Sequence, residues 1–187
     1  MPPARRISYT AYNRVYFWTA TIHNWQHLLL DDGLKKVITS SLKKLSDEQK
    51  INVYGFVIMP NHIHLIWQQN KPNGKETPKG SLLKYTAHVF VKHLQETGQI
   101  NNYVVNEPNK KHEVWQRDAM GIEIYTRKVA IQKLNYIHNN PLQDRWRLAK
   151  HTAEYYYSSA RFYEFGDSDF DFLKNIYGLF DEKGDLA

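Results

Sequence analysis

The stretch YGFVIMPNHIHLIW, residues 54–67, places two histidines one residue apart within an otherwise apolar run. Aromatic and β-branched residues dominate on both sides, which favours strands. Only Pro60 and Asn61 separate the two halves, a spacing typical of a tight turn between antiparallel strands. We therefore expect strands at 51–60 and 62–69 that pair as a hairpin.

Hydrophobic patterning predicts the elements on either side of this hairpin. We expect strands at 13–25 and near 113–117, and helices at 31–49, 81–98 and 126–140. The order strand, helix, strand, strand, helix, strand, helix is typical of an α+β fold. Such a fold has an antiparallel sheet with helices packed mainly on one face.

Charge is distributed unevenly along the chain. The 187 residues carry a net charge of +6, and 42% of them are hydrophobic, which suits one domain with a packed core. Residues 166–187 hold six acidic residues and two lysines, a net charge of −4 that leaves +10 on residues 1–165. We predict a basic body over 1–165 and an acidic tail over 166–187. Such a body suits a polyanionic partner, most simply nucleic acid, although a solvated basic surface is the plain alternative.

The absence of cysteine excludes several classes of protein. A disulfide-stapled scaffold, a thiolate zinc site and a thiol nucleophile all need a residue that the chain lacks. The N-terminus MPPARRISYT has no apolar core of a signal peptide, and no apolar run reaches the roughly 20 residues that span a bilayer. We expect a cytoplasmic protein without a membrane partner, associated with the nucleoid when bound to DNA.

The two histidines lie on one side of the predicted strand. Alternation places His62 and His64 on one face, and Ile63 and Leu65 on the other. Two neutral imidazoles on one face can chelate a divalent ion, with a third ligand from elsewhere and positions left open for substrate. Taken alone, the pair favours two solvent-facing histidines on a half-exposed sheet over a metal site.

A second informative segment is KLNYIHNNPLQDRW, residues 133–146. Tyr136 and Asn140 are four residues apart and so share one helix face, which Lys133 extends upstream. By itself, this segment favours a packed tyrosine whose hydroxyl finds a partner, and an asparagine that ends a helix before proline.

Together the segments resemble the tyrosine transposases of the HUH nuclease superfamily, and within that group the REP-associated tyrosine transposases. The resemblance is carried by YGFVIMPNHIHLIW, VWQRDAMGIEIY, YIHNNPLQDRW and YYYSSARFY, over about residues 10–165. Family members show M-P-N-H-x-H-L, Y-I-x-x-N-P and a late S-S-x-R/A-x-Y segment. One departure follows the N-P pair, where a small-residue stretch such as A-G-L is replaced by Leu142 to Trp146.

This resemblance implies a ferredoxin-like or RRM-like sheet and a metal-dependent DNA-cutting and joining enzyme. His62, His64 and Asn140 would hold Mg²⁺ or Mn²⁺, Tyr136 would be the nucleophile, and Lys133 is a candidate for catalytic support. Attack would give a 5′-phosphotyrosine and a free 3′-OH. The implied partner is single-stranded DNA with hairpin or palindromic elements, bound by a monomer or a homodimer.

Aromatic residues beside cations are candidates for stacking on unpaired bases. They are Trp115 with Arg117, Trp146 with Arg145 and Arg147, and the tyrosines 155–157 with Arg161. Core packing is the alternative for about half of these aromatics. Three other functions stay open: a domesticated hairpin-binding protein without activity, a hydrolase that activates water while Tyr136 is structural, and, more weakly, an RNA-binding protein.

Overall fold

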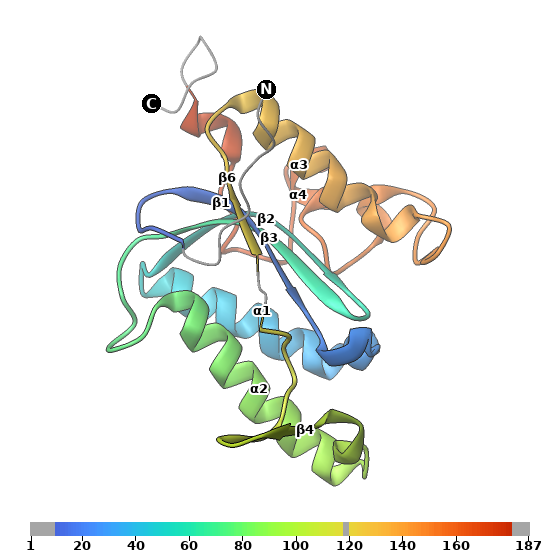
Figure 1. Ribbon diagram of the computed structural model, residues 1–187. Helices are drawn as coiled ribbons and strands as arrows, with labels where there is room; N and C mark the ends of the chain where they lie inside the picture. Colours follow the sequence, from blue (N-terminus) through green and yellow to red (C-terminus); the bar gives the residue numbers. More distant parts are fainter. Residues whose placement is uncertain (1–9, 118–119, 181–187) are drawn as a thin grey trace.

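A four-stranded antiparallel sheet forms the centre of the protein (Figure 1). The computed structural model describes residues 10–117 and 120–180. Its elements include β1 Val15–Thr21, α1 Asp32–Asp47, β2 Ile51–Met59, β3 His62–Gln69, α2 Pro78–Glu96, β6 Met120–Glu123 and α3 Arg127–Asn139. The sheet order is β2-β3-β1-β6 with every pair antiparallel, which is the split βαβ arrangement of ferredoxin-like folds. The predicted α+β class and antiparallel sheet are thereby confirmed.

Helices cover both faces of this sheet (Figure 1). The two helices of the ferredoxin-like unit, α1 and α2, pack on one face against Trp18, Leu65 and Trp67. The other face carries Phe17 and Ile66, and there α3 packs, although we expected helices mainly on one face. The reason is that β1 and β3 are apolar on both sides, so each side needs a cover. Within residues 10–117 and 120–180, no helix is long and apolar enough to cross a membrane.

Capping side chains fix where the helices begin. Asp31 caps α1 and Thr126 caps α3 by accepting backbone N–H groups. Helix α2 begins at Pro78 instead of near Ser81, because the Thr77 side chain caps it and proline is well suited to the first helical turn.

The segment between α2 and α3 differs most from prediction. A 3₁₀ turn, Ile100–Tyr103, leads into β4 Val104–Glu107 and β5 Lys110–His112, which form a separate two-stranded hairpin. Pro108 and Asn109 form the turn between them. The strand expected near 113–117 is reduced to one isolated bridge between Trp115 and Ile22, and the fourth strand of the main sheet is β6.

The C-terminal part of the described chain packs along β2. After short turns at Thr152–Glu154 and helix α4 Ala160–Phe165, the backbone of Leu173 forms a parallel bridge with Val53. Phe172 and Ile176 are buried, the latter in the 3₁₀ turn Ile176–Leu179. Residues 166–180 of the predicted acidic tail therefore belong to the packed body, and residues 181–187 lie outside the described part of the chain.

Gly55 lets α3 lie close to β2. A Cβ atom at this position would be 2.8 Å from Leu134 Cδ2 and 3.2 Å from Ile137 Cδ1, both on α3. The strand pairing also shifts between Val53 and Gly55, which marks a bulge at this contact. The position of α3 over the sheet thus depends on the absence of a side chain at residue 55.

We predict that Gly55→Ala lowers the free energy of unfolding by about 1–3 kcal/mol, because the added methyl overpacks a buried contact. The matched control is Gly178→Ala, since a Cβ there meets nothing within 4 Å and the change should stay within about 0.5 kcal/mol. Urea unfolding followed by circular dichroism measures both. Equal stability of the two variants would contradict the assigned packing.

Candidate active site

Strand β3 presents His62 and His64 on the face that α3 covers. On β1, Thr21 pairs with His62 and Thr19 pairs with His64. On β2, Met59 pairs with His62 and Val57 pairs with His64. The two imidazole centroids are 4.7 Å apart. The shared face predicted from alternation is confirmed, and the intervening Ile63 faces the α1/α2 core.

Both imidazoles are buried instead of facing solvent. His62 is 4% exposed and His64 is 5% exposed. Burial lowers the pKa of His62 to about 4, and the charge of Arg145 contributes further. Burial also holds the pKa of His64 well below its ordinary value, with added effects from His62, Lys133 and Arg145. Both rings are therefore neutral near pH 7, the form that binds metal ions.

Tyr136 on α3 lies beside the histidine pair. Its ring centroid is 5.4 Å from that of His64 and 5.9 Å from that of Phe17. The side chain is 43% exposed, so a substrate can reach it from solvent. The Lys133 ammonium lies 4.8 Å from the centroid of the Phe17 ring, which places a positive charge in the same cluster.

Asn140 lies one helical turn beyond Tyr136 and is fully buried. It caps the C-terminus of α3 and begins the 3₁₀ turn Asn140–Leu142, which contacts β2. Neither its side-chain oxygen nor its side-chain nitrogen has a hydrogen-bond partner. A buried amide without partners is costly, so this side chain lacks an interaction that a ligand could supply.

The side chains of His62, His64 and Asn140 offer donor atoms of the kinds that bind divalent cations. His64 Nε2 and Asn140 Oδ1 are both buried and without a hydrogen-bond partner, and a cation would satisfy each of them. The donor set of two imidazole nitrogens and one amide oxygen suits Mn²⁺ and is tolerable to Mg²⁺. The described residues contain no cluster of three or more His, Cys, Asp or Glu side chains that could hold a metal ion. Metal ligation by the mixed set remains a prediction.

Trp146 and Arg145 form one side of this site. The Trp146 ring centroid lies 6.1 Å from that of His62 and 5.6 Å from that of His27. The Arg145 guanidinium lies 5.4 Å from the Trp146 ring. Arg147 follows in an exposed left-handed conformation, with its guanidinium 3.1 Å from the Asp144 carboxylate. This loop therefore brings the positive charge of Arg145 and the aromatic ring of Trp146 to the histidine pair.

The other predicted DNA contacts lie elsewhere. Trp115 is 7% exposed and donates its indole N–H to Thr86 at 2.9 Å, so it serves the core and the prediction that it stacks on DNA is corrected. Arg117 is exposed but ion-paired with Glu107 and Glu113. Arg161 lies on α4, where it pairs with an aspartate at 3.1 Å.

Trp25 is a residue that the sequence analysis missed. Its side chain is 59% exposed, and both Asn24 and Trp25 adopt left-handed backbone conformations, with φ of 51° and 56°. Such conformations are uncommon in residues other than glycine and often occur at functional sites. The Trp25 carbonyl accepts a hydrogen bond of 3.2 Å from Asn61, the neighbour of His62. The loop of Trp25 therefore adjoins the histidine pair.

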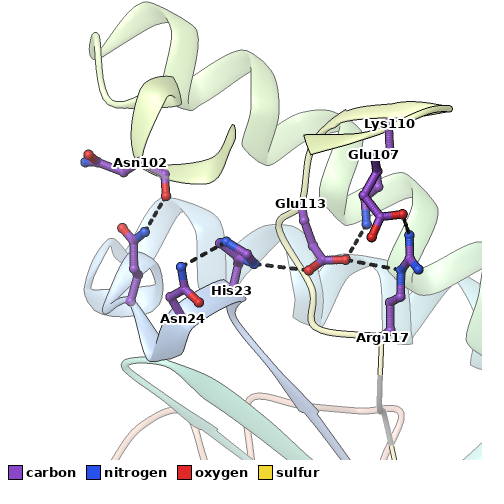
Figure 2. Close-up of polar contacts among 8 residues, drawn as sticks. His23, Asn24, Asn102, Glu107, Lys110, Glu113 and Arg117 are labelled. Carbon is purple, nitrogen blue, oxygen red and sulfur yellow. Dashed lines mark hydrogen bonds and ion pairs between the residues drawn. The ribbon is translucent and has the colours of Figure 1, made fainter. Parts of the chain in front are cut away.

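Polar contacts hold this loop in place (Figure 2). His23 Nδ1 lies 3.1 Å from a Glu113 carboxylate oxygen, and Asn24 contacts the other ring nitrogen of His23 at 3.0 Å. Gln26 donates to the carbonyl of Asn102 at 2.7 Å. The network connects the loop to the segment around β4 and β5, so hydrogen bonds hold the backbone that carries the exposed Trp25 indole.

His138 is a second residue without a role in the sequence analysis. Its Nε2 lies 2.8 Å from Ser159 Oγ, which accepts from the backbone N–H of Phe56 on β2 at 3.0 Å. Burial lowers the pKa of His138 to about 4. The contact joins α3 to β2 through the late serine motif.

The fold and this site define an α+β protein in which a buried histidine pair on a sheet meets a tyrosine on a covering helix. No family model and no curated protein matches the sequence. A solved structure, described as a REP-associated tyrosine transposase bound to a REP hairpin, superposes with a TM-score of 0.60. The match covers 97% of this chain and 96% of the other, at 16% sequence identity. The resemblance expected from the motifs is confirmed at the level of the fold.

The buried histidines predict a loss of stability in mild acid. The unfolded chain takes up protons near pH 6.5, whereas folded His62 and His138 do so near pH 4. The free energy of unfolding should therefore fall as the pH drops from 6.5 towards 4, by up to about 1.4 kcal/mol per pH unit for each histidine. Urea unfolding with a chelator at several pH values measures this slope.

Substitutions show which histidines cause the pH dependence of the free energy of unfolding. His138→Gln should reduce the slope, whereas His88→Gln, at an exposed position of α2, should leave it unchanged. A stability that is flat between pH 6.5 and 5 in the unmodified protein would contradict the burial of neutral imidazoles.

Proposed function

We propose that this protein is a transposase-type enzyme that nicks and rejoins single-stranded DNA, with Tyr136 as the nucleophile. One observation carries the proposal: the Tyr136 ring is open to solvent and lies 5.4 Å from the ring of the buried His64. A tyrosine that served only the core would be covered, and a histidine pair that served only the surface would not be buried.

Tyr136 acts by covalent catalysis. Its phenolic oxygen forms a bond to the phosphorus of the DNA backbone, and the bond from phosphorus to the 3′ oxygen breaks. The phenolic proton is lost and the 3′ oxygen ends as a hydroxyl, so no oxidant or reductant is needed. Since the phosphotyrosine keeps the energy of the broken bond, rejoining needs no ATP. The Lys133 ammonium lies one turn before Tyr136 and beside Phe17, and we assign it catalytic support.

His62, His64 and Asn140 would hold Mg²⁺ or Mn²⁺. The ion supplies charge neutralisation at the scissile phosphate. The protein keeps both imidazoles neutral through burial, and it keeps the Asn140 amide free of competing hydrogen bonds. Support for this assignment comes from the partnerless buried atoms of His64 and Asn140.

The proposed substrate is single-stranded DNA that forms a hairpin. The structural neighbour is bound to a REP hairpin, and the net charge of +6 suits a polyanion. Arg145 and Trp146 border His62 on one side, and the exposed indole of Trp25 lies in the adjoining loop. Aromatic rings of this kind stack on unpaired bases next to a backbone contact.

We predict that Tyr136→Phe abolishes a covalent protein–DNA adduct, by at least about a thousandfold, while hairpin binding persists. The assay incubates the protein with Mn²⁺ and a hairpin-bearing single strand and resolves adducts under denaturing conditions. Tyr125→Phe is the matched control, because Tyr125 is also exposed and lies just before the same helix.

The products distinguish the proposal from its rivals. Adduct formation by Tyr136→Phe would point to another nucleophile. Cleavage to free ends without any adduct would indicate a hydrolase. Hairpin binding without cleavage by the unmodified protein would favour the domesticated DNA-binding protein.

We predict that Trp25→Ala weakens binding of the single-stranded DNA that flanks the hairpin by roughly 5- to 150-fold, the range expected for one stacked base. Tyr85→Ala removes an equally exposed aromatic ring from α2 and should leave affinity unchanged. Fluorescence anisotropy of a labelled oligonucleotide measures both dissociation constants. Equal affinities for the Trp25 variant and the unmodified protein would remove Trp25 from the interface.

A further inference from the structure

We propose that Asn61 and Thr19 are positioning residues that hold His62 and His64 in the tautomer with hydrogen on Nδ1. Both Nε2 lone pairs are then available on the α3 side of the sheet. The inference rests on the proposed function, because it assigns how the two imidazoles are prepared as ligands.

The orientation of the Asn61 amide fixes the tautomer of His62. Asn61 Nδ2 donates to the Trp25 carbonyl at 3.2 Å, and a carbonyl accepts only. The amide oxygen of Asn61 must therefore be the atom that lies 2.6 Å from His62 Nδ1. Since that oxygen also accepts only, His62 Nδ1 carries the hydrogen and Nε2 carries a lone pair.

Burial protects the hydrogen bond between Asn61 and His62 from competition by water. Asn61 is 5% exposed, so water does not compete for its oxygen. The surrounding backbone holds the turn in place, with Ile22 donating to the carbonyl of Asn61 at 2.8 Å and Leu29 donating to that of Pro60 at 2.9 Å. The Asn61 amide thus makes two hydrogen bonds, one from its nitrogen to the Trp25 loop and one from its oxygen to His62.

Thr19 plays the corresponding role for His64. Thr19 is paired with His64 across β1 and β3, and its hydroxyl lies 2.7 Å from His64 Nδ1. Phe17 stacks on the same imidazole with a centroid distance of 5.2 Å, which restricts ring rotation. A hydroxyl can donate or accept, so the other ring nitrogen decides the tautomer.

The environment of His64 Nε2 decides whether the Thr19 hydroxyl donates or accepts. That nitrogen is buried and has no hydrogen-bond partner. A hydrogen placed there would be a buried donor that no cation could satisfy, whereas a lone pair there is what a cation binds. Thr19 therefore accepts from Nδ1–H, which is how histidine ligands are commonly oriented by their surroundings.

Long-range ¹H–¹⁵N correlation NMR of ¹⁵N-histidine-labelled, metal-free protein near pH 7 tests the inference. We expect His62 and His64 to show protonated Nδ1 and unprotonated Nε2. In Asn61→Ala the His62 signal should lose this fixed pattern, and in Thr19→Val the His64 signal should do so. Titration with Mn²⁺ alone should then show affinity reduced about 10- to 100-fold.

Two further variants separate positioning from packing. Thr19→Ser keeps the hydroxyl and should restore both the tautomer and the Mn²⁺ affinity. Thr39→Val removes another buried hydroxyl, on α1, and should change neither. A protonated Nε2 on either histidine of the unmodified protein would overturn the inference, even if a variant fails to fold. Unchanged tautomers in folded Asn61→Ala and Thr19→Val would overturn it as well.

Failure of the proposed function would look different. Protonated Nδ1 on both histidines together with no binding of Mn²⁺ would support the positioning by Asn61 and Thr19. The same result would count against the metal site.

Discussion

The register of β3 between β1 and β2 is the constraint on which the site depends. Because strand side chains alternate, a slip of one residue would turn His62 and His64 into the α1/α2 core and send Ile63 to the α3 face. The fit of large side chains on each face opposes that slip, since Trp18 and Leu65 fill one core while Phe17 and Ile66 fill the other. The same pairing places Thr19 beside His64.

The placement of α3 is the second requirement, and it follows from the first. Gly55 on β2 gives the helix room to approach, and the contact between His138 and Ser159 joins it to the backbone of Phe56. Tyr136 then lies open to solvent beside His64, and Asn140, one turn further along the chain, is buried. In the proposed site, the sheet would supply nitrogen atoms and the helix would supply oxygen atoms.

Local patterns in the sequence predict much of this arrangement. The hairpin, the shared face of His62 and His64, and the common face of Tyr136 and Asn140 each depend on residues within one or two turns or strands. The fold class follows from the order of such elements. The resemblance to a known family assigns roles to the residues, and the structural likeness supports it for the fold.

What sequence could not predict depends on contacts between distant segments. Trp115 is enclosed by α2, and Thr19 is 45 residues away from the histidine that it contacts. The left-handed backbone that exposes Trp25 leaves no clear pattern in its neighbours. Helices cover both faces because α3 follows the ferredoxin-like unit, and nothing within one segment shows which face it will take.

The central claim is that His62, His64 and Asn140 converge on one divalent cation beside Tyr136. Anomalous diffraction from crystals soaked in Mn²⁺ tests it most directly. We expect a single strong peak bonded to Nε2 of both histidines and to the Asn140 side-chain oxygen. A peak at any other set of ligands, or no peak between the two imidazoles at saturating Mn²⁺, would contradict it.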